Sequence, residues 1–463
     1  MFKRFCAILL IFASLCFAAG CGRTDGGREA EKTEAPPTEA ASSVPAAETA
    51  SDAPEATEAP QEKFYVLDKR CDTSGPSQSA MLETDDACYF LCSDGVGGYE
   101  IWVSDKEYKD WMPLCAKPDC LHRYSSCNAK LEGEVNHSFW LYGDHIYYLT
   151  IDWDAAFPFD GAELWRMKLD GSDHELVLKP ELPYSKALES VIRSASGAFR
   201  SMAFDFTGKY AFIVYGASGM TNDGSCTAKH VTDRYMIDLS RPEDGAVLME
   251  FTDETGEPVP FYGVLLGKGE SVYCFGYDSI YDPETETSEI SNAALYAYDI
   301  PTRRGRKLCD LDFDPTDCFK SEYDGTLYFV PVFGSQYKEI YAVDLETGEV
   351  EKTYEQNGER MLRGVPYKQY IFVDSAISDP TAVTSEYGVS VYGMDGELVQ
   401  QRAFKEGESP VRFLAFMGDL AFGTLMSNDP DYKEDMEYKQ PPMWYLDLND
   451  IGTDGLRWRK WEP

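Results

Sequence analysis

Two strand-like patterns recur in the same order along the chain, and this repetition limits the possible folds more than any other feature. The first is a short aromatic run with alternating apolar residues, as in His145-Ile-Tyr-Tyr-Leu149. The second follows it and often ends in aspartate and a turn, as in Glu163-Leu-Trp-Arg-Met-Lys-Leu-Asp170. Period-two alternation with Tyr, Val and Trp is typical of β-strands. Turn dipeptides such as Asp170-Gly171 would join them, so we predict an all-β domain of repeated strand pairs.

The second pattern occurs seven times, and a central aromatic residue marks each copy. The seven markers are Trp102, Trp165, Tyr235, Tyr296, Tyr341, Tyr392 and Tyr445. Their spacings run from 45 to 70 residues, near or above the ~40–50 residues of a propeller blade. This predicts a seven-bladed β-propeller over residues 64–463, with longer loops in the first half. A pair of β-sandwiches is the alternative, but nothing resembles a linker within this range.

The two ends of the predicted propeller both contain strand-like runs. We expect residues 64–67 and 456–461 to share the last blade and close the ring, which would remove open strand edges. Helical periodicity is confined to a short stretch at residues 186–193.

The N-terminus has the layout of an export signal. A basic leader, Met1 to Arg4, precedes an apolar stretch at residues 5–17 that is too short to cross a bilayer as a helix. The residues before Cys21 resemble the lipobox of bacterial lipoproteins, although Ala18 stands where leucine is usual. The resemblance implies that residues 1–20 are removed and that Cys21 is lipidated. The chain would then be anchored to the cell membrane on its extracytoplasmic side; ordinary cleavage and secretion is the alternative.

Residues 21–63 have the composition of a linker. After Cys21 they consist almost entirely of Glu, Ala, Thr, Pro, Ser and Gly, with ten acids, four bases and no aromatic residue. Such a segment cannot bury enough apolar surface to offset its ordering entropy, so we expect it to be disordered. It would serve as a spacer between the anchor and the propeller, or it is low-complexity filler; the two have the same sequence properties.

The net charge excludes some partners. The chain has 42 Lys plus Arg against 80 Asp plus Glu, a formal charge of -38. A surface this acidic repels phosphate backbones and anionic lipid headgroups. We therefore expect no nucleic-acid binding and no membrane contact apart from the lipid anchor.

Three cysteines and a histidine form the one concrete chemical cluster. Cys115, Cys120, His122 and Cys127 have the spacing C-x₄-C-x-H-x₄-C. Three thiolates and an imidazole can supply the tetrahedral shell of a Zn²⁺ ion. Four protein ligands would close that shell, so the metal would hold a loop in place and would not catalyse. An exported domain can instead oxidise two of these cysteines to a disulfide, with His122 at the surface; both alternatives stay open at this point.

Two further cysteines lie on one predicted strand. Cys88 and Cys92 are four residues apart and face the same side, about 13 Å from one another at ~3.3 Å per residue. They are too far apart to bond to each other. We expect them in a blade core, or paired with cysteines elsewhere such as Cys71.

Two stretches carry a family resemblance. Repeats such as Leu164-Trp-Arg-Met-Lys-Leu-Asp-Gly-Ser172 resemble the blades of TolB-type and low-density-lipoprotein-receptor-type propellers. Residues 113–129 resemble a motif of lipoproteins from anaerobic Gram-positive bacteria, in which a lipobox and tether precede an uncharacterised propeller. The resemblance implies location and fold, and it implies no activity.

No catalytic motif accompanies the fold. The sequence contains no G-x-S-x-G elbow, P-loop, HExxH or G-x-G-x-x-G. We therefore predict a cell-surface propeller that binds a glycan, peptide or protein without catalysis. The alternative is an extracytoplasmic carbohydrate-active enzyme, whose paired carboxylates would face the central channel.

The predicted ligand-binding residues lie in the first half of the domain. We expect the loops at residues 152–161, 218–230 and 277–291 to cover one sector of the ring. The first loop contains Trp153, Phe157 and Phe159, which are apolar enough to stack on a sugar or to hold a peptide. The alternative is that these aromatics only pin their own loop.

Overall fold

The structure is a computed structural model of the full chain. The described residues are 64–66, 81–93, 98–108, 110–122, 127–131, 134–151, 162–182, 184–194, 199–220, 228–259, 265–282, 287–332, 338–355, 364–374, 388–404, 411–425 and 444–460.

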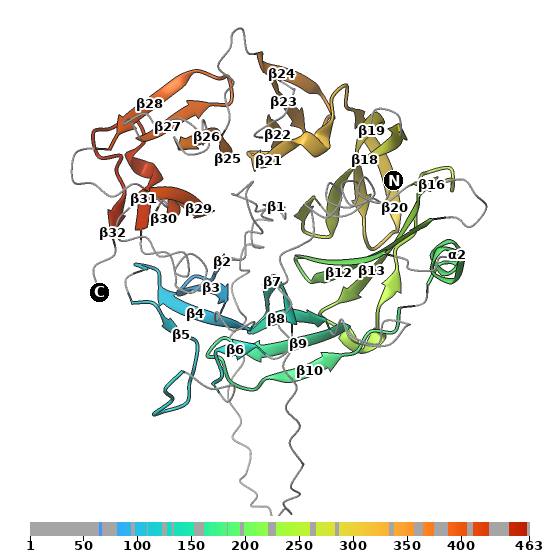
Figure 1. The fold of residues 1–463 in the computed structure, drawn as a ribbon, viewed down its shortest axis with the longest axis horizontal. Helices are drawn as coiled ribbons and strands as arrows, with labels where there is room; N and C mark the ends of the chain where they lie inside the picture. Colours follow the sequence, from blue (N-terminus) through green and yellow to red (C-terminus); the bar gives the residue numbers. More distant parts are fainter. Residues whose placement is uncertain are drawn as a thin grey trace, which may run out of the picture.

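The described residues form seven antiparallel sheets arranged in a ring (Figure 1). Each of these blades contains four strands that follow one another in the chain, the first lying toward the centre of the ring. The first three blades are β2 (Met81–Glu83), β3 (Ala87–Ser93), β4 (Tyr99–Asp105) and β5 (Met112–Pro113); β7 (Glu134–Tyr142), β8 (His145–Ile151), β9 (Ala162–Lys168) and β10 (Glu175–Leu178); and β11 (Phe199–Thr207), β12 (Tyr210–Met220), β13 (Ala228–Asp238) and β14 (Val247–Leu248).

The remaining four blades continue around the ring. They are β17 (Leu266–Lys268), β18 (Ser271–Asp282), β19 (Thr287–Asp299) and β20 (Arg304–Asp310); β21 (Cys318–Tyr323), β22 (Thr326–Pro331), β23 (Glu339–Asp344) and β24 (Val350–Glu355); β25 (Val365–Tyr367), β26 (Tyr370–Asp374), β27 (Gly388–Gly393) and β28 (Leu398–Ala403); and β29 (Val411–Met417), β30 (Leu420–Leu425), β31 (Trp444–Asp447) and β32 (Arg459–Lys460). The predicted seven-bladed β-propeller is confirmed.

The ring does not close in the predicted way. Residues 64–67 and 456–461 were expected to share the last blade, but β1 (Phe64–Val66) pairs with β17, the inner strand of blade 4. Strand β32 pairs with β31 in blade 7. The expectation was wrong because every blade already completes its four strands from consecutive segments, so no strand needs to be exchanged. Figure 1 shows β1 near the middle of the ring.

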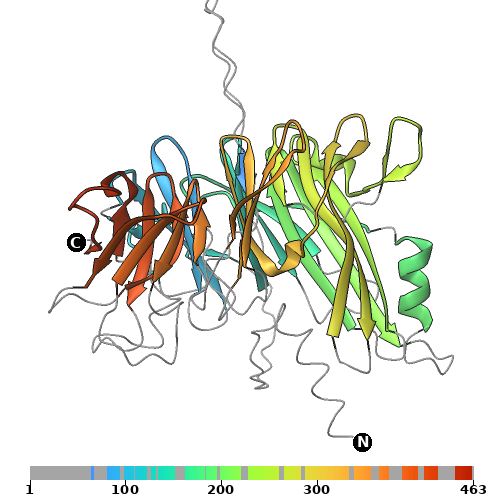
Figure 2. The same cartoon turned by 90° about the horizontal axis from the view of Figure 1, so that it is seen from above.

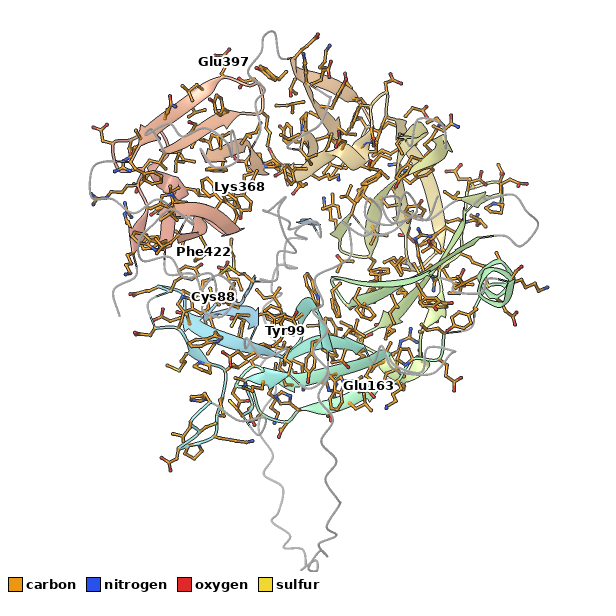
Figure 3. All side chains as sticks on the ribbon, viewed as in Figure 1. Cys88, Tyr99, Glu163, Lys368, Glu397 and Phe422 are labelled. Carbon is orange, nitrogen blue, oxygen red and sulfur yellow. The ribbon has the colours of Figure 1, made fainter. Side chains whose placement is uncertain are left out.

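Apolar side chains hold the first and last blades together instead. Cys88 and Phe90 of blade 1 share one buried cluster with Met417 and Phe422 of blade 7. The Tyr108 ring lies 5.4 Å from the Phe422 ring in an edge-to-face arrangement, a favourable geometry for two aromatic rings. Figure 3 shows Cys88 and Phe422 on the two sides of this seam. Ring closure therefore depends on packing across the seam.

An aspartate lies at the end of the third strand of every blade or two residues after it, and its carboxylate organises the turn that follows. In each case its Oδ1 accepts a hydrogen bond from a backbone N–H two or three residues later, at 2.8–3.1 Å. These aspartates are Asp105, Asp170, Asp238, Asp299, Asp344, Asp395 and Asp447. Such a bond closes an Asx turn, which explains why the repeat ends in aspartate.

Three of these turns contain a glycine that touches the preceding blade. Gly171, Gly348 and Gly396 all have φ near +78°, a region that L side chains disfavour. A Cβ on Gly171 would lie 2.2 Å from the carbonyl oxygen of Leu114, and one on Gly396 would lie 2.1 Å from the Tyr354 ring. The turn of one blade therefore fits under the outer strand of the blade before it.

The two faces of the ring have connections of different length. Two residues separate the first and second strands in each described hairpin from β7–β8 to β29–β30. Longer segments of the chain separate the second strand from the third, for example residues 152–161, 375–387 and 426–443. The two-residue turns therefore lie on one face, and the ends of the second and third strands that the longer segments connect lie on the other.

The wide spacing of the first repeats comes from insertions between blades and from long strands. The insertions are the segment between β5 and β6 (Lys130–Leu131), the helix α2 (Lys186–Ser194), and the pair β15 (Phe251–Thr252) and β16 (Pro258–Val259). Both views place α2 outside the ring (Figures 1 and 2). The predicted helical stretch is thus confirmed. In the described part of the chain, no helix is long and apolar enough to cross a membrane.

Two of the three predicted loops are partly strands. Strands β12 and β13 occupy Ser218–Met220 and Ala228–His230. Likewise, β18 and β19 occupy most of residues 277–291. The expectation of long loops in the first half was wrong here. The polar residues of these two ranges extend the β12–β13 and β18–β19 hairpins, whereas they had been expected to form loops.

Candidate metal centre

The segment with the three cysteines and the histidine lies at the outer edge of blade 1. Strands β5 and β6 both pair with β4, at Trp102–Val103 and at Tyr99–Glu100 respectively. The segment between them is hereafter the cysteine loop (residues 114–129), and its described residues, 114–122 and 127–129, lie at the outer side of the ring beside β5 in Figure 1. Both ends of the loop are fixed by the same strand, so the residues between them are brought back together.

The structure gathers all four predicted ligands. The ligand atoms of Cys115, Cys120, His122 and Cys127 all lie within 4.8 Å of one another, and His122 Nδ1 is 3.4 Å from Cys127 Sγ. Sulfur atoms bound at ~2.3 Å to one tetrahedral Zn²⁺ are separated by about 3.8 Å. A small contraction would bring the four atoms onto such a shell. The cluster could therefore hold a metal ion.

The backbone of the loop turns sharply where the ligands converge. Asp119 and His122 have φ values of +63° and +54°, which non-glycine residues seldom adopt. The backbone N–H of Cys120 donates to the carbonyl oxygen of Lys117 at 3.4 Å. These turns point Cys120 and His122 back toward Cys115.

The sulfur atoms are not equivalent. Burial works against the thiolate of Cys115, but hydrogen bonds from the backbone N–H groups of Lys117 and Asn128 and from the thiols of Cys120 and Cys127 together outweigh it and lower the pKa of Cys115. Burial raises the pKa of Cys127 to about 12. Hydrogen bonds to the charged form and loss of water act in opposite directions on a thiol. Without a metal ion, negative charge is therefore favoured on Cys115.

Residues of blade 2 contact the cysteine loop. His174 Nε2 donates to the carbonyl oxygen of Asn128 at 2.8 Å, so Nδ1 of the neutral ring is left to accept the Tyr148 hydroxyl at 3.2 Å. Tyr148 is fully buried. Leu114, at the start of the loop, packs on Gly171 of the blade 2 turn. His174 was not among the residues predicted from the sequence, and the signal for it was its place just after the Asp170 turn.

The described cysteines carry free thiols. All eight of them, including the three of the cysteine loop, are unbonded. Cys88 and Cys92 are 0% and 2% exposed and lie in the seam between blades 1 and 7. Their prediction as blade-core residues is confirmed.

Other predicted site residues lie outside the described part of the chain. These are the lipidation site Cys21, the possible partner Cys71, and the aromatic residues Trp153, Phe157 and Phe159. Among the described carboxylates, Glu322 has a pKa raised by burial. Its side chain accepts the Gly325 N–H at 2.8 Å, so it closes the β21–β22 hairpin.

The chain matches no protein-family model and no curated protein sequence. Among solved structures it is similar to the tricorn protease, with 13% identity and a TM-score of 0.23, over 74% of this chain and 32% of that one. It is also similar to a puromycin-hydrolysing peptidase of Mycobacterium tuberculosis, with 11% identity and a TM-score of 0.39, over 83% of this chain and 54% of that one. A third similar structure is an uncharacterised protein of Listeria monocytogenes, with 9% identity and a TM-score of 0.39, over 85% of this chain and 97% of that one. The chain thus spans about a third of the tricorn protease and about half of the peptidase.

Proposed function

We propose that this chain is a cell-surface lipoprotein whose propeller binds a ligand without catalysing a reaction on it. The observation that carries the proposal is the difference between the two faces of the ring. The two-residue turns lie on one face, and the longer connections between second and third strands, such as residues 152–161 and 426–443, start from the other. Binding sites are commonly built from loops on a rigid scaffold. We therefore assign the ligand to the face with the longer connections.

The aromatic residues Trp153, Phe157 and Phe159 belong to one of these connections, residues 152–161. Aromatic rings offer large apolar area and stack on sugars and apolar peptide side chains. The chain carries a formal charge of -38, which disfavours polyanionic ligands. The proposed ligand is thus a neutral glycan, a peptide or a partner protein.

Array binding with matched variants tests the ligand-binding part of the proposal. The purified protein should bind a subset of glycans or peptides, and Trp153→Ala should lose this binding with an unchanged melting temperature. The control is Tyr323→Ala, which removes an aromatic ring that is 39% exposed on the face of tight turns; its binding should be normal. A lower melting temperature of Trp153→Ala without any loss of binding would mean that the ring only packs its own loop.

We propose that Cys21 anchors the protein to the extracytoplasmic side of the cell membrane. The support is the basic leader, the short apolar stretch and the small residues before Cys21. Fractionation of cells that express Cys21→Ser should move the protein from the membrane pellet to the soluble fraction. Equal amounts of mutant and wild type in the pellet would contradict the anchor.

We propose that the cysteine loop binds one structural Zn²⁺ through Cys115, Cys120, His122 and Cys127. The support is the convergence of the four ligand atoms and the preference of zinc for sulfur and imidazole ligands in closed structural sites. When bound, the metal would keep the loop in its present shape against blade 2. It would leave no open coordination position for a substrate.

Elemental analysis of protein purified without reductant tests the metal. One zinc per chain is expected, with the three loop thiols protected from alkylation until a chelator is added. Cys120→Ser should lose the zinc, whereas Cys309→Ser, which removes a half-buried thiol of β20, should keep it. Zinc well below one per chain, with two loop cysteines unreactive even after chelation, would indicate a disulfide.

A further inference from the structure

A pocket lies between blades 3 and 4, on the face of tight turns. Its volume is about 380 Å³, within the range typical of small-ligand sites. Four turns meet there: the β11–β12 and β17–β18 hairpins and the turns that follow β13 and β19. It is therefore separate from the face proposed above to bind a ligand, and from the cysteine loop.

The pocket has an apolar part and a polar part. Tyr210, Met236 and Ile300 are buried members of the apolar cluster that joins the two blades, and they reach the pocket wall. On the polar side, Lys209 Nζ lies 2.5 Å from Glu270 Oε1. The same carboxylate accepts the Tyr210 hydroxyl at 3.2 Å, so these charges are already matched.

A second ion pair neutralises the far wall of the pocket. Arg241 lies 3.1 Å from Asp244 and 3.7 Å from Asp238. Lys209 and Arg241 are therefore each engaged by an acid. Neither one offers a free positive charge to a ligand.

Arg303 differs from these two cations. Within the described part of the chain its guanidinium forms no ion pair, and its side-chain contact is with the Met249 sulfur. Arg303 is half-buried, and loss of water lowers its pKa, which shows that its charge is poorly compensated. In a chain with a net charge of -38, a desolvated arginine without an acid at a pocket wall is unusual.

The backbone also holds Arg303 in a strained position. Its φ is +55°, a region costly for a side chain with a Cβ. Its N–H donates to the carbonyl oxygen of Ile300, and its own carbonyl oxygen accepts the Thr252 N–H. Both bonds fix the residue at the pocket wall. Strain of this kind is concentrated at ligand sites.

We infer that this pocket binds a monocarboxylate with an apolar body, and that Arg303 holds the carboxylate. Arginine recognises carboxylates through two parallel hydrogen bonds. Because Glu270, Asp238 and Asp244 already engage Lys209 and Arg241, only the charge of Arg303 is left for a ligand, which favours a single negative charge over a dianion such as phosphate. The apolar wall of Tyr210, Met236 and Ile300 would receive the body of the ligand. The C-terminus of a peptide with an apolar last residue has this chemistry.

Calorimetric titration of the purified full-length protein tests the inference. N-acetyl-L-leucine should bind saturably, and N-acetyl-L-leucinamide, which lacks the charge, should bind at least about tenfold more weakly. Arg303→Gln should weaken the binding of N-acetyl-L-leucine by a similar factor. Arg306→Gln, the control, removes an exposed arginine of β20 outside the pocket and should bind normally.

A second readout separates binding from a structural role. A desolvated charge without a partner does not stabilise the fold, so Arg303→Gln should melt at the same temperature as wild type or higher. Equal affinity for the acid and the amide, no saturation up to about 50 mM, or tighter binding of inorganic phosphate would overturn the inference. So would a lower melting temperature of Arg303→Gln with unchanged binding. Trp153→Ala should not affect this site, so the two proposals fail independently.

Discussion

Blade 1 contains two groups of cysteines, one at its inner side and one at its outer edge, and Cys115 and Cys120 of the outer group differ from the inner pair in exposure. Cys88 and Cys92 face the seam with blade 7 and are 0% and 2% exposed. Cys115 and Cys120 lie in the projecting loop and are partly exposed, next to His122. Burial raises the pKa of Cys88 to about 11, whereas backbone N–H groups lower that of Cys115. Cys88 and Cys92 pack in the apolar seam, and the cysteines of the loop are suited to bind a metal.

This comparison shows that the residue type alone does not set the role. The inner cysteines lie on a regular strand, where residues i and i+4 share a face but stay far apart. The outer cysteines lie on tight turns, which bring residues five and seven positions apart within one coordination shell. The local backbone therefore decides whether neighbouring thiols pack or bind.

Thiol reactivity should separate the two groups most strongly. After removal of any metal, Cys115 should be alkylated at least about 10³-fold faster than Cys88, because the thiolate is the reactive form and Cys88 reacts only when the seam opens. Timed alkylation with mass spectrometry of the peptides measures both rates. Similar rates for Cys88 and Cys115 would show that the seam is open in solution.

Removing the aromatic partner at the inner seam should have the next largest effect. Phe422 is fully buried beside Tyr108, and Phe422→Ala should lower the free energy of unfolding by about 3–5 kcal/mol through lost contacts and a cavity. Denaturant unfolding measures the change, and the zinc content should stay the same. A loss below about 1 kcal/mol would mean that packing across this seam does not close the ring.

The sequence predicted the repeating parts of this structure because each blade uses the same local chemistry. The aspartate at the end of each third strand marks a turn that its own carboxylate closes. The spacing of Cys115, Cys120, His122 and Cys127 marks one compact site. Both signals are local in the chain, so periodicity and spacing suffice to find them.

Contacts between blades could not be predicted in this way. The pairing of β1 with β17 joins residues about 200 positions apart, and no local pattern specifies that partner. Arg303 looks like any surface arginine in the sequence, and only the approach of blades 3 and 4 places it at a pocket. The role of His174 likewise depends on Asn128 of the neighbouring blade.

A substitution under the cysteine loop tests how tightly the outer edge is held. Gly171→Ala adds a Cβ at φ +78°, 2.2 Å from the Leu114 carbonyl oxygen, and should cost about 2–4 kcal/mol from strain and overpacking together. Gly143→Ala is the matched control, since its φ is +61° and nothing lies within 4 Å of the added Cβ. It should cost only about 1–2 kcal/mol. Equal losses in urea unfolding would mean that the contact with Leu114 contributes nothing.

The smallest expected effect concerns the charge of the same turn. The side chain and backbone N–H of Ser172 donate to Asp170 and lower its pKa. The folded pKa thus lies below the unfolded value of about 3.9, so the charged form stabilises the protein above that value, and the contribution is lost as the pH falls through the folded pKa.

Asp170→Asn keeps an oxygen acceptor for the turn but removes the charge. Since Asp170 is largely exposed, the variant should be less stable by only a few tenths of a kcal/mol near pH 7, and the difference should shrink as the pH falls through the lowered pKa of Asp170. Asp344→Asn should behave in the same way, because hydrogen bonds from Thr347 also lower the pKa of Asp344. Urea midpoints of the three proteins between pH 7 and pH 2.5 measure the trend. A difference between wild type and Asp170→Asn that grows toward low pH would contradict the lowered pKa of Asp170.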